Sequence, residues 1–97
     1  MKTLEQIKQI LESKKDVYKD QYYVKELYIF GSYTRHDQNE NSDIDILVEF
    51  EKPVSLLHLT SLENYLSDTL GEKIDLVPKK NIREELKSTI LKEAIPV

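Results

Sequence analysis

Three aspartates and a glycine–serine pair are the residues of this chain whose types and spacing could perform chemistry. Asp43 and Asp45 stand two positions apart in the run SDIDILVEF, and Asp75 interrupts the apolar residues of KIDLV. Gly31 and Ser32 follow another apolar run. Carboxylates are the ligands that Mg²⁺ prefers, and a glycine turn with bare backbone N–H groups can hold phosphate oxygens. The pattern indicates a site for a metal-bound phosphate compound.

The spacing of the first two aspartates favours a cation between them. Residues two apart on a strand point to the same side, with Cα atoms about 6.5 Å apart. Ionised carboxylates placed in this way repel each other unless a positive charge lies between them. Two magnesium ions about 4 Å apart, each with oxygen ligands at about 2.1 Å, would be bridged by such a pair. Asp75 adds a third carboxylate if its strand pairs with that of Asp45.

An alternative interpretation assigns no chemistry to these carboxylates. Asp43 could cap a turn with Ser42, and Asp45 could lie on a solvated face of a sheet, as a lone acidic residue usually does. The three acidic residues alone leave the two interpretations evenly matched. The Gly31-Ser32 turn favours the site, because it adds a phosphate-binding turn to the metal-binding carboxylates.

Hydrophobic periodicity predicts the elements that must position these residues. Apolar residues at helical spacing predict a first helix from Leu4, and Thr3 and Gln6 form its capping box. A β-prone run over residues 22–30 leads to Gly31, and a short polar segment joins it to the first helix. Residues 44–50 alternate, so that Ile44, Ile46, Val48 and Phe50 face one way and Asp45, Leu47 and Glu49 the other.

The second half of the chain predicts three further elements. They are a leucine-striped helix over 56–70 between Ser55 as N-cap and Gly71 as stop, a strand over 73–78, and a helix capped by Asn81 and Glu84 that ends before Pro96. This order predicts an α/β (α+β) fold, a small mixed sheet with flanking helices, with strand 44–50 at its centre. At 97 residues we expect one domain over 1–97.

Composition and charge limit the kinds of site, the cellular location and the partners that we expect. The chain has no cysteine, which excludes disulfides and thiolate metal sites. It shows neither a signal peptide nor a membrane-spanning run, so we expect a soluble cytoplasmic protein. The net charge of -4 argues against free nucleic acid as the partner, because phosphate backbones would be repelled.

The stretch GSYTRHDQNENSDIDILVEF resembles the signature of the nucleotidyltransferase superfamily that includes DNA polymerase β. That signature is a glycine–serine pair, a loop, an Asp-x-Asp motif and a third acidic residue on a later strand. The whole chain resembles the minimal nucleotidyltransferases (MNT) that pair with HEPN-domain toxins. The resemblance implies a polymerase β-like core, with ATP as substrate and two Mg²⁺ ions as cofactors.

The resemblance also implies a role for each residue of the motif. Gly31 and Ser32 would bind the β- and γ-phosphates of the nucleotide. Asp43 and Asp45 would ligate the two magnesium ions. Asp75 would complete the second metal site and help to activate the attacking hydroxyl group.

The loop after the turn carries further features of this family. Arg35 matches a common arginine, and from its charge alone it could steady phosphates or pair with Asp43. Thr34 stands where alanine is frequent and His36 where glycine is frequent. His36 would disturb the loop if its backbone requires a positive φ.

Two functions follow as hypotheses. The first is the transfer of AMP from ATP to a hydroxyl group of another protein, which the resemblance implies to be a tyrosine of a cognate HEPN ribonuclease toxin. The chain would then be an enzymatic antitoxin. The second is neutralisation of the toxin by binding and occlusion alone. The clustered carboxylates favour the enzyme. The length of 97 residues disfavours a third candidate, an antibiotic nucleotidyltransferase, because those enzymes resemble this core with an added helical domain, which we do not expect here.

Three other features receive less specific interpretations. Lys79, Lys80 and Arg83 form a basic cluster that suits a solvated helix start better than a contact with phosphate or an acidic partner. His58, in a leucine-rich helix, is expected to pack rather than to bind a ligand. Tyr33 could stack on a base.

Overall fold

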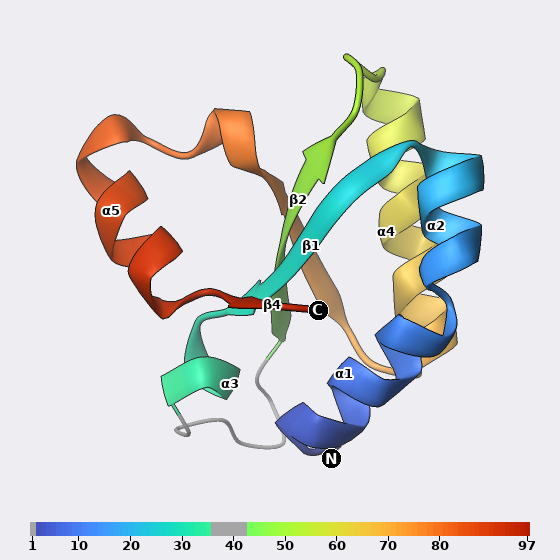
Figure 1. Cartoon of the computed structure of the whole chain (residues 1–97), viewed down its shortest axis with the longest axis horizontal. Helices are drawn as coiled ribbons and strands as arrows, with labels where there is room; N and C mark the ends of the chain where they lie inside the picture. Colours follow the sequence, from blue (N-terminus) through green and yellow to red (C-terminus); the bar gives the residue numbers. More distant parts are fainter. Residues whose placement is uncertain (1, 36–42) are drawn as a thin grey trace.

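The computed structural model describes residues 2–35 and 43–97. Figure 1 shows its elements in chain order: α1 (Leu4–Ser13), α2 (Lys15–Tyr22), β1 (Val24–Phe30), α3 (Ser32–Arg35), β2 (Ile44–Phe50), α4 (Leu56–Leu70), β3 (Ile74–Pro78), the 3₁₀ turn η1 (Lys79–Asn81), α5 (Glu84–Glu93) and β4 (Ile95–Pro96).

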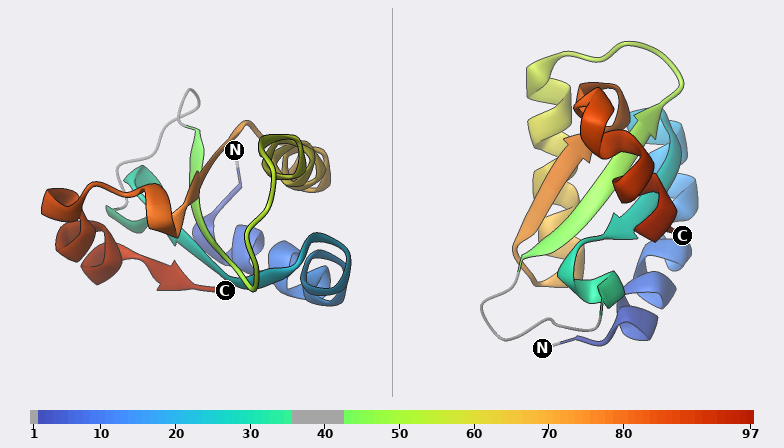
Figure 2. Two further views of the ribbon diagram at one scale, coloured as in Figure 1. Left: turned by 90° about the horizontal axis from the view of Figure 1, so that it is seen from above. Right: turned by 90° about the vertical axis from the view of Figure 1, so that its left-hand side faces the viewer.

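The strands form one mixed sheet in the order β3-β2-β1-β4. β2 pairs antiparallel with β1 and parallel with β3, and β1 pairs antiparallel with β4. Helices α1, α2 and α4 lie on one face of this sheet, and α5 lies on the other (Figure 2). The predicted fold class is therefore confirmed, and β2 is one of the two inner strands.

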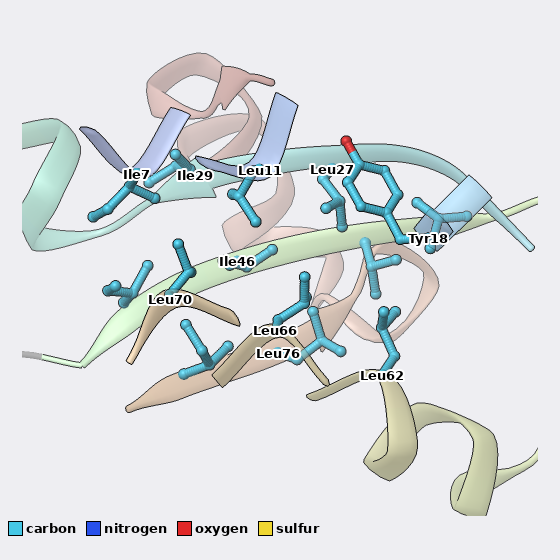
Figure 3. Packing of buried hydrophobic residues seen from close by; sticks show 14 of the residues in the cluster. Ile7, Leu11, Tyr18, Leu27, Ile29, Ile46, Leu62, Leu66, Leu70 and Leu76 are labelled. Atoms are coloured by element: carbon cyan, nitrogen blue, oxygen red, sulfur yellow. The ribbon is translucent and has the colours of Figure 1, made fainter. Parts of the chain in front are cut away.

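The core lies between the sheet and helices α1, α2 and α4 (Figure 3). β2 contributes Ile44, Ile46 and Val48, all fully buried, while its alternate residues point to the opposite face. This follows from the two-residue period of a strand. The core therefore holds β2 in a register that directs Asp45 away from the helices.

The ends of α1 and α4 form as the sequence predicts. The Thr3 hydroxyl accepts from the backbone N–H of Gln6 at 3.1 Å, and the backbone N–H of Thr3 donates to the Gln6 side chain at 2.9 Å. Ser55 caps α4 by accepting from the backbone N–H of His58 at 3.1 Å, and Gly71 ends it with a φ of 65°. Among the described residues, no helix is both long and apolar enough to cross a membrane.

The prediction that only a short polar segment joins the first helix to the first strand is wrong, because this part of the chain forms helix α2. Only one residue of α2, Tyr18, is fully buried, so its hydrophobic periodicity is too weak to predict a helix. The strand begins at Val24 rather than at residue 22. Tyr23, in the left-handed conformation with a φ of 59°, separates the two elements.

The C-terminal region differs from prediction in two respects. The cap predicted at Asn81 is wrong, because Asn81 belongs to η1 and α5 begins at Glu84 after Arg83, without a side-chain cap. The chain then continues into β4, which the sequence did not predict. Pro96 is compatible with this strand because β4 lies at the edge of the sheet, where a missing N–H costs no ladder bond.

Candidate active site

The sheet brings two of the predicted carboxylates side by side. Asp45 on β2 is in register with Asp75 on the parallel strand β3, and Cα atoms of paired residues lie about 4.8 Å apart. Asp43 comes immediately before β2, two positions from Asp45, and its side chain is half-buried. The pairing of strands on which the contribution of Asp75 depends is therefore present.

The surroundings of Asp45 raise the pKa of its side chain. Burial, followed by the negative charges of Asp75 and Asp43, raises its pKa from 3.8 to about 6. The positive charge of Arg35 acts in the opposite direction, as the smallest of these causes. The two neighbouring carboxylates therefore both contribute to the potential at Asp45, and a bound cation would relieve their repulsion.

Gly31 approaches the same carboxylate from the end of β1. Its φ of 78° lies in the left-handed region, which favours glycine. A Cβ atom at this position would overlap Oδ2 of Asp45 and lie 3.0 Å from its Cγ. Gly31 is thus required both by the backbone conformation and by the close packing of Asp45. Turn and carboxylate form one structural unit.

A single helical turn, α3, follows this glycine. The carbonyl oxygen of Gly31 accepts from the backbone N–H of Thr34 at 3.1 Å and from the Thr34 hydroxyl at 2.9 Å. The glycine–serine pair thus leads directly into a short helix. Ser32 begins it and is half-buried. Tyr33 points into the core and is 1% exposed, so the suggestion that its ring could stack on a base is wrong.

Arg35 at the end of α3 is connected to the C-terminal helix. Its guanidinium Nη1 lies 3.6 Å from Oε2 of Glu93 on α5, and both side chains are substantially exposed. The sequence offered phosphate or Asp43 as partners for this arginine and missed Glu93. No local pattern could have found it, because the contact depends on how α5 returns across the sheet. His36, the next predicted feature, lies outside the described residues.

The three aspartates suit Mg²⁺ by the chemistry of their oxygen donors and by the repulsion that a cation would relieve. Within residues 2–35 and 43–97, however, no group of three or more His, Cys, Asp or Glu side chains converges closely enough to hold a metal ion. Like charges without a cation favour separated side-chain positions. The residues fit a magnesium site, and the two-ion arrangement stays a prediction.

His58 packs as predicted and lies far from the carboxylates. Its ring Nε2 is 2.7 Å from the carbonyl oxygen of Tyr22, and the ring contacts those of Tyr22, Tyr23 and Phe50. This histidine joins the end of α2 to the start of α4.

Comparison with protein families places the motif in a known context. Residues 4–97 match the model of the nucleotidyltransferase domain. A candidate protein adenylyltransferase of Methanocaldococcus jannaschii is 56% identical over 82 residues, which cover 84% of each chain. The protein adenylyltransferase MntA of Thermococcus cleftensis is 42% identical over 97 residues and covers 100% of this chain and 98% of its own.

Solved structures agree in fold. A candidate minimal nucleotidyltransferase superposes with a TM-score of 0.84 at 30% identity, covering 99% of this chain and 97% of its own. A toxin–antitoxin complex crystallised with AMP-PNP matches with a TM-score of 0.71 at 25% identity, covering 88% of this chain and 70% of the matched one.

Proposed function

The chain belongs to the nucleotidyltransferase domain family, and from this premise we propose that it transfers AMP from ATP to a hydroxyl group of a partner protein. The partner that we propose is a HEPN-type ribonuclease toxin, with a tyrosine as the acceptor. Modification would make this chain the antitoxin of the pair.

One observation carries the proposal. Asp45 is in register with Asp75 and packs directly against Gly31, so the glycine–serine turn and two carboxylates meet at one end of the sheet. This geometry suits a nucleotide whose phosphates rest on the turn while a cation joins them to the carboxylates. The name of the MntA relative and the AMP-PNP in the toxin–antitoxin complex support an adenine nucleotide as the substrate.

We assign a role to each residue of the site. The backbone at Gly31 and Ser32 holds the β- and γ-phosphates, and Arg35 offers positive charge beside them. Asp43, Asp45 and Asp75 would hold Mg²⁺, which when bound neutralises charge on the phosphates and on the departing pyrophosphate.

The reaction that we propose is an in-line displacement at phosphorus. The acceptor oxygen attacks the α-phosphorus of ATP, the bond between this phosphorus and the bridging oxygen breaks, and pyrophosphate leaves. The proton of the acceptor hydroxyl moves to a nearby carboxylate or to water. Asp75 is the best placed of the three to receive it, because its side chain is exposed while Asp45 and Asp43 are half-buried.

Mass spectrometry tests the proposal. The chain is incubated with the candidate toxin, ATP and Mg²⁺, and the intact mass of the toxin is measured. We expect a gain of a whole number of AMP masses, and we expect the toxin to stay inactive after this chain has been removed. Asp45→Asn should abolish the mass gain, while Asp68→Asn, the same substitution at an exposed position on α4, should not.

The alternative is neutralisation by occlusion, and the same experiment distinguishes it. Under occlusion the mass of the toxin stays constant, its activity returns when the chains are separated, and Asp45→Asn still protects cells. Such a result would contradict the enzymatic proposal and support a binding antitoxin.

A further inference from the structure

A groove rimmed by lysines lies at the end of β2 that is remote from the aspartates. It has a volume of about 420 Å³ and is formed by the end of β2 and the three residues after it, the end of β3, the start of η1 and one residue of α5. We call it the lysine groove, after Lys52, Lys79, Lys80 and Lys87. The residues of the proposed transfer site do not line it.

The charge of this groove is opposite to that of the whole chain. Four lysines and two glutamates, Glu49 and Glu51, line it, whereas the net charge of the chain is -4. Lys79 lies 3.7 Å from Glu49. Within residues 2–35 and 43–97, Lys80 and Lys87 form no ion pair, so their charges are available to a ligand.

The floor of the groove is apolar and continues beyond it. Phe50 and Pro78 line both the lysine groove and an adjoining hollow of about 300 Å³, which extends to Leu56 at the start of α4. Leu56 is 76% exposed and its neighbour Leu57 is 83% exposed. An apolar surface of this kind, rimmed by charge, is typical of a site that binds another protein.

We propose that the lysine groove is a docking site for an acidic, amphipathic segment of the acceptor protein, separate from the site of transfer. The apolar side of the segment would cover Phe50 and Leu56, and its carboxylates would pair with Lys80 and Lys87. The identity of the acceptor protein rests on the proposed function. The acidic and amphipathic character of the segment is inferred from the lysines and apolar residues that line the groove.

The mixed lining favours a protein segment over RNA. Glu49 and Glu51 would repel a phosphate backbone, and the net charge of the chain would oppose the approach of a polyanion. A peptide can place carboxylates only opposite the lysines and apolar side chains over the floor. Electrostatic complementarity of this kind sets specificity and the rate of association.

The position of the groove restricts where the acceptor hydroxyl can lie. Glu49, at the groove, and Asp45, at the transfer site, occupy the same face of β2, four residues apart, which corresponds to about 13 Å. A helix covers this distance in about nine residues and an extended chain in about four. Leu47, which lies between them on this face, is fully buried, so the partner cannot follow the strand directly and these lengths are minimum values. The acidic segment and the modified residue are therefore separated by more than this minimum, and docking of the segment would orient the hydroxyl.

Calorimetric titration with the candidate HEPN-type partner, in the absence of nucleotide, tests the proposal. Lys80→Glu combined with Lys87→Glu should raise the Kd for the partner at least tenfold. In transfer assays the same variant should raise the KM for the partner and leave kcat and the affinity for a fluorescent ATP analogue unchanged. Lys8→Glu combined with Lys14→Glu, on the helical face of the molecule, is the matched control and should change the Kd less than twofold.

Each remaining outcome supports or overturns the proposal. If the glutamate variant does not fold, Lys80→Gln with Lys87→Gln replaces it and should give a smaller rise in Kd. An unchanged Kd in a folded groove variant would overturn the docking site. Loss of RNA binding with an unchanged Kd for the partner would assign the groove to RNA and also overturn it. A partner that docks tightly yet gains no AMP would contradict only the proposed function.

Discussion

Alanine substitution at the two glycines of the chain tests the packing on which the proposed active site depends. Both Gly31 and Gly71 have a positive φ, of 78° and 65°. The cost of the left-handed conformation for alanine is about 1–2 kcal/mol at either position. Only at Gly31 would the new Cβ overlap a neighbour, the carboxylate of Asp45; at Gly71 the nearest atom, Nζ of Lys2, is 3.9 Å away.

The overlap should add a further cost at Gly31 alone. A carboxylate forced from its rotamer costs about 0.5–1.5 kcal/mol, and overpacking in general about 1–3 kcal/mol. We therefore expect Gly71→Ala to lower the free energy of unfolding by about 1–2 kcal/mol and Gly31→Ala by about 2–5 kcal/mol. Displacement of Asp45 should also lower transfer activity in Gly31→Ala and leave that of Gly71→Ala unchanged.

Denaturant titration of both variants in the presence of a chelator measures the difference. A double-mutant cycle identifies its source: in the Asp45→Ala background, Gly31→Ala should cost about as much as Gly71→Ala, because the overlapping oxygen is gone. Equal destabilisation by Gly31→Ala and Gly71→Ala in the wild-type background would refute the close contact between Gly31 and Asp45. It would also refute the conclusion that the glycine–serine turn and the carboxylate of Asp45 pack as one structural unit.

Three further changes test separate parts of the structure. Asp45→Asn should stabilise the metal-free chain at pH 7 by about 1 kcal/mol, less than the roughly 3 kcal/mol of the full shift because the site is partly solvated. The pKa of Asp45 in the folded chain is raised to about 6, so ionisation of Asp45 lowers the stability of the wild type as the pH rises from about 4 to 6. Denaturant titrations should therefore show equal stability of Asp45→Asn and wild type at pH 4, and the full stabilisation by Asp45→Asn above pH 6. Glu93→Gln should change the free energy of unfolding by less than about 0.5 kcal/mol, because its ion pair with Arg35 is exposed. The same substitution should raise the affinity for triphosphate a few-fold, measured by titration with a fluorescent analogue, because it removes a negative charge beside Arg35. His58→Ala should lower the free energy of unfolding by about 1–3 kcal/mol, because the carbonyl of Tyr22 loses its 2.7 Å partner, without changing triphosphate affinity.

Local patterns predicted the main elements because their causes act over a few residues. The capping box at Thr3, the serine cap at Ser55 and the glycine stop at Gly71 all form as the sequence predicts. The alternation of β2 correctly assigned Ile46 to the core and Asp45 to the opposite face. Elements without a strong local pattern were missed, as α2 shows with its single fully buried residue.

The sequence by itself determined the chemical identity of this protein: three carboxylates, a glycine–serine turn and the family to which their order belongs. The tertiary structure alone decided how these residues meet. Parallel pairing places Asp45 beside Asp75, and the turn of β1 presses Gly31 against the same carboxylate. The return of α5 brings Glu93 to Arg35. Such contacts join residues distant in the chain, and they depend on which faces of the sheet and helices are buried together, a property of the whole fold that no local pattern encodes.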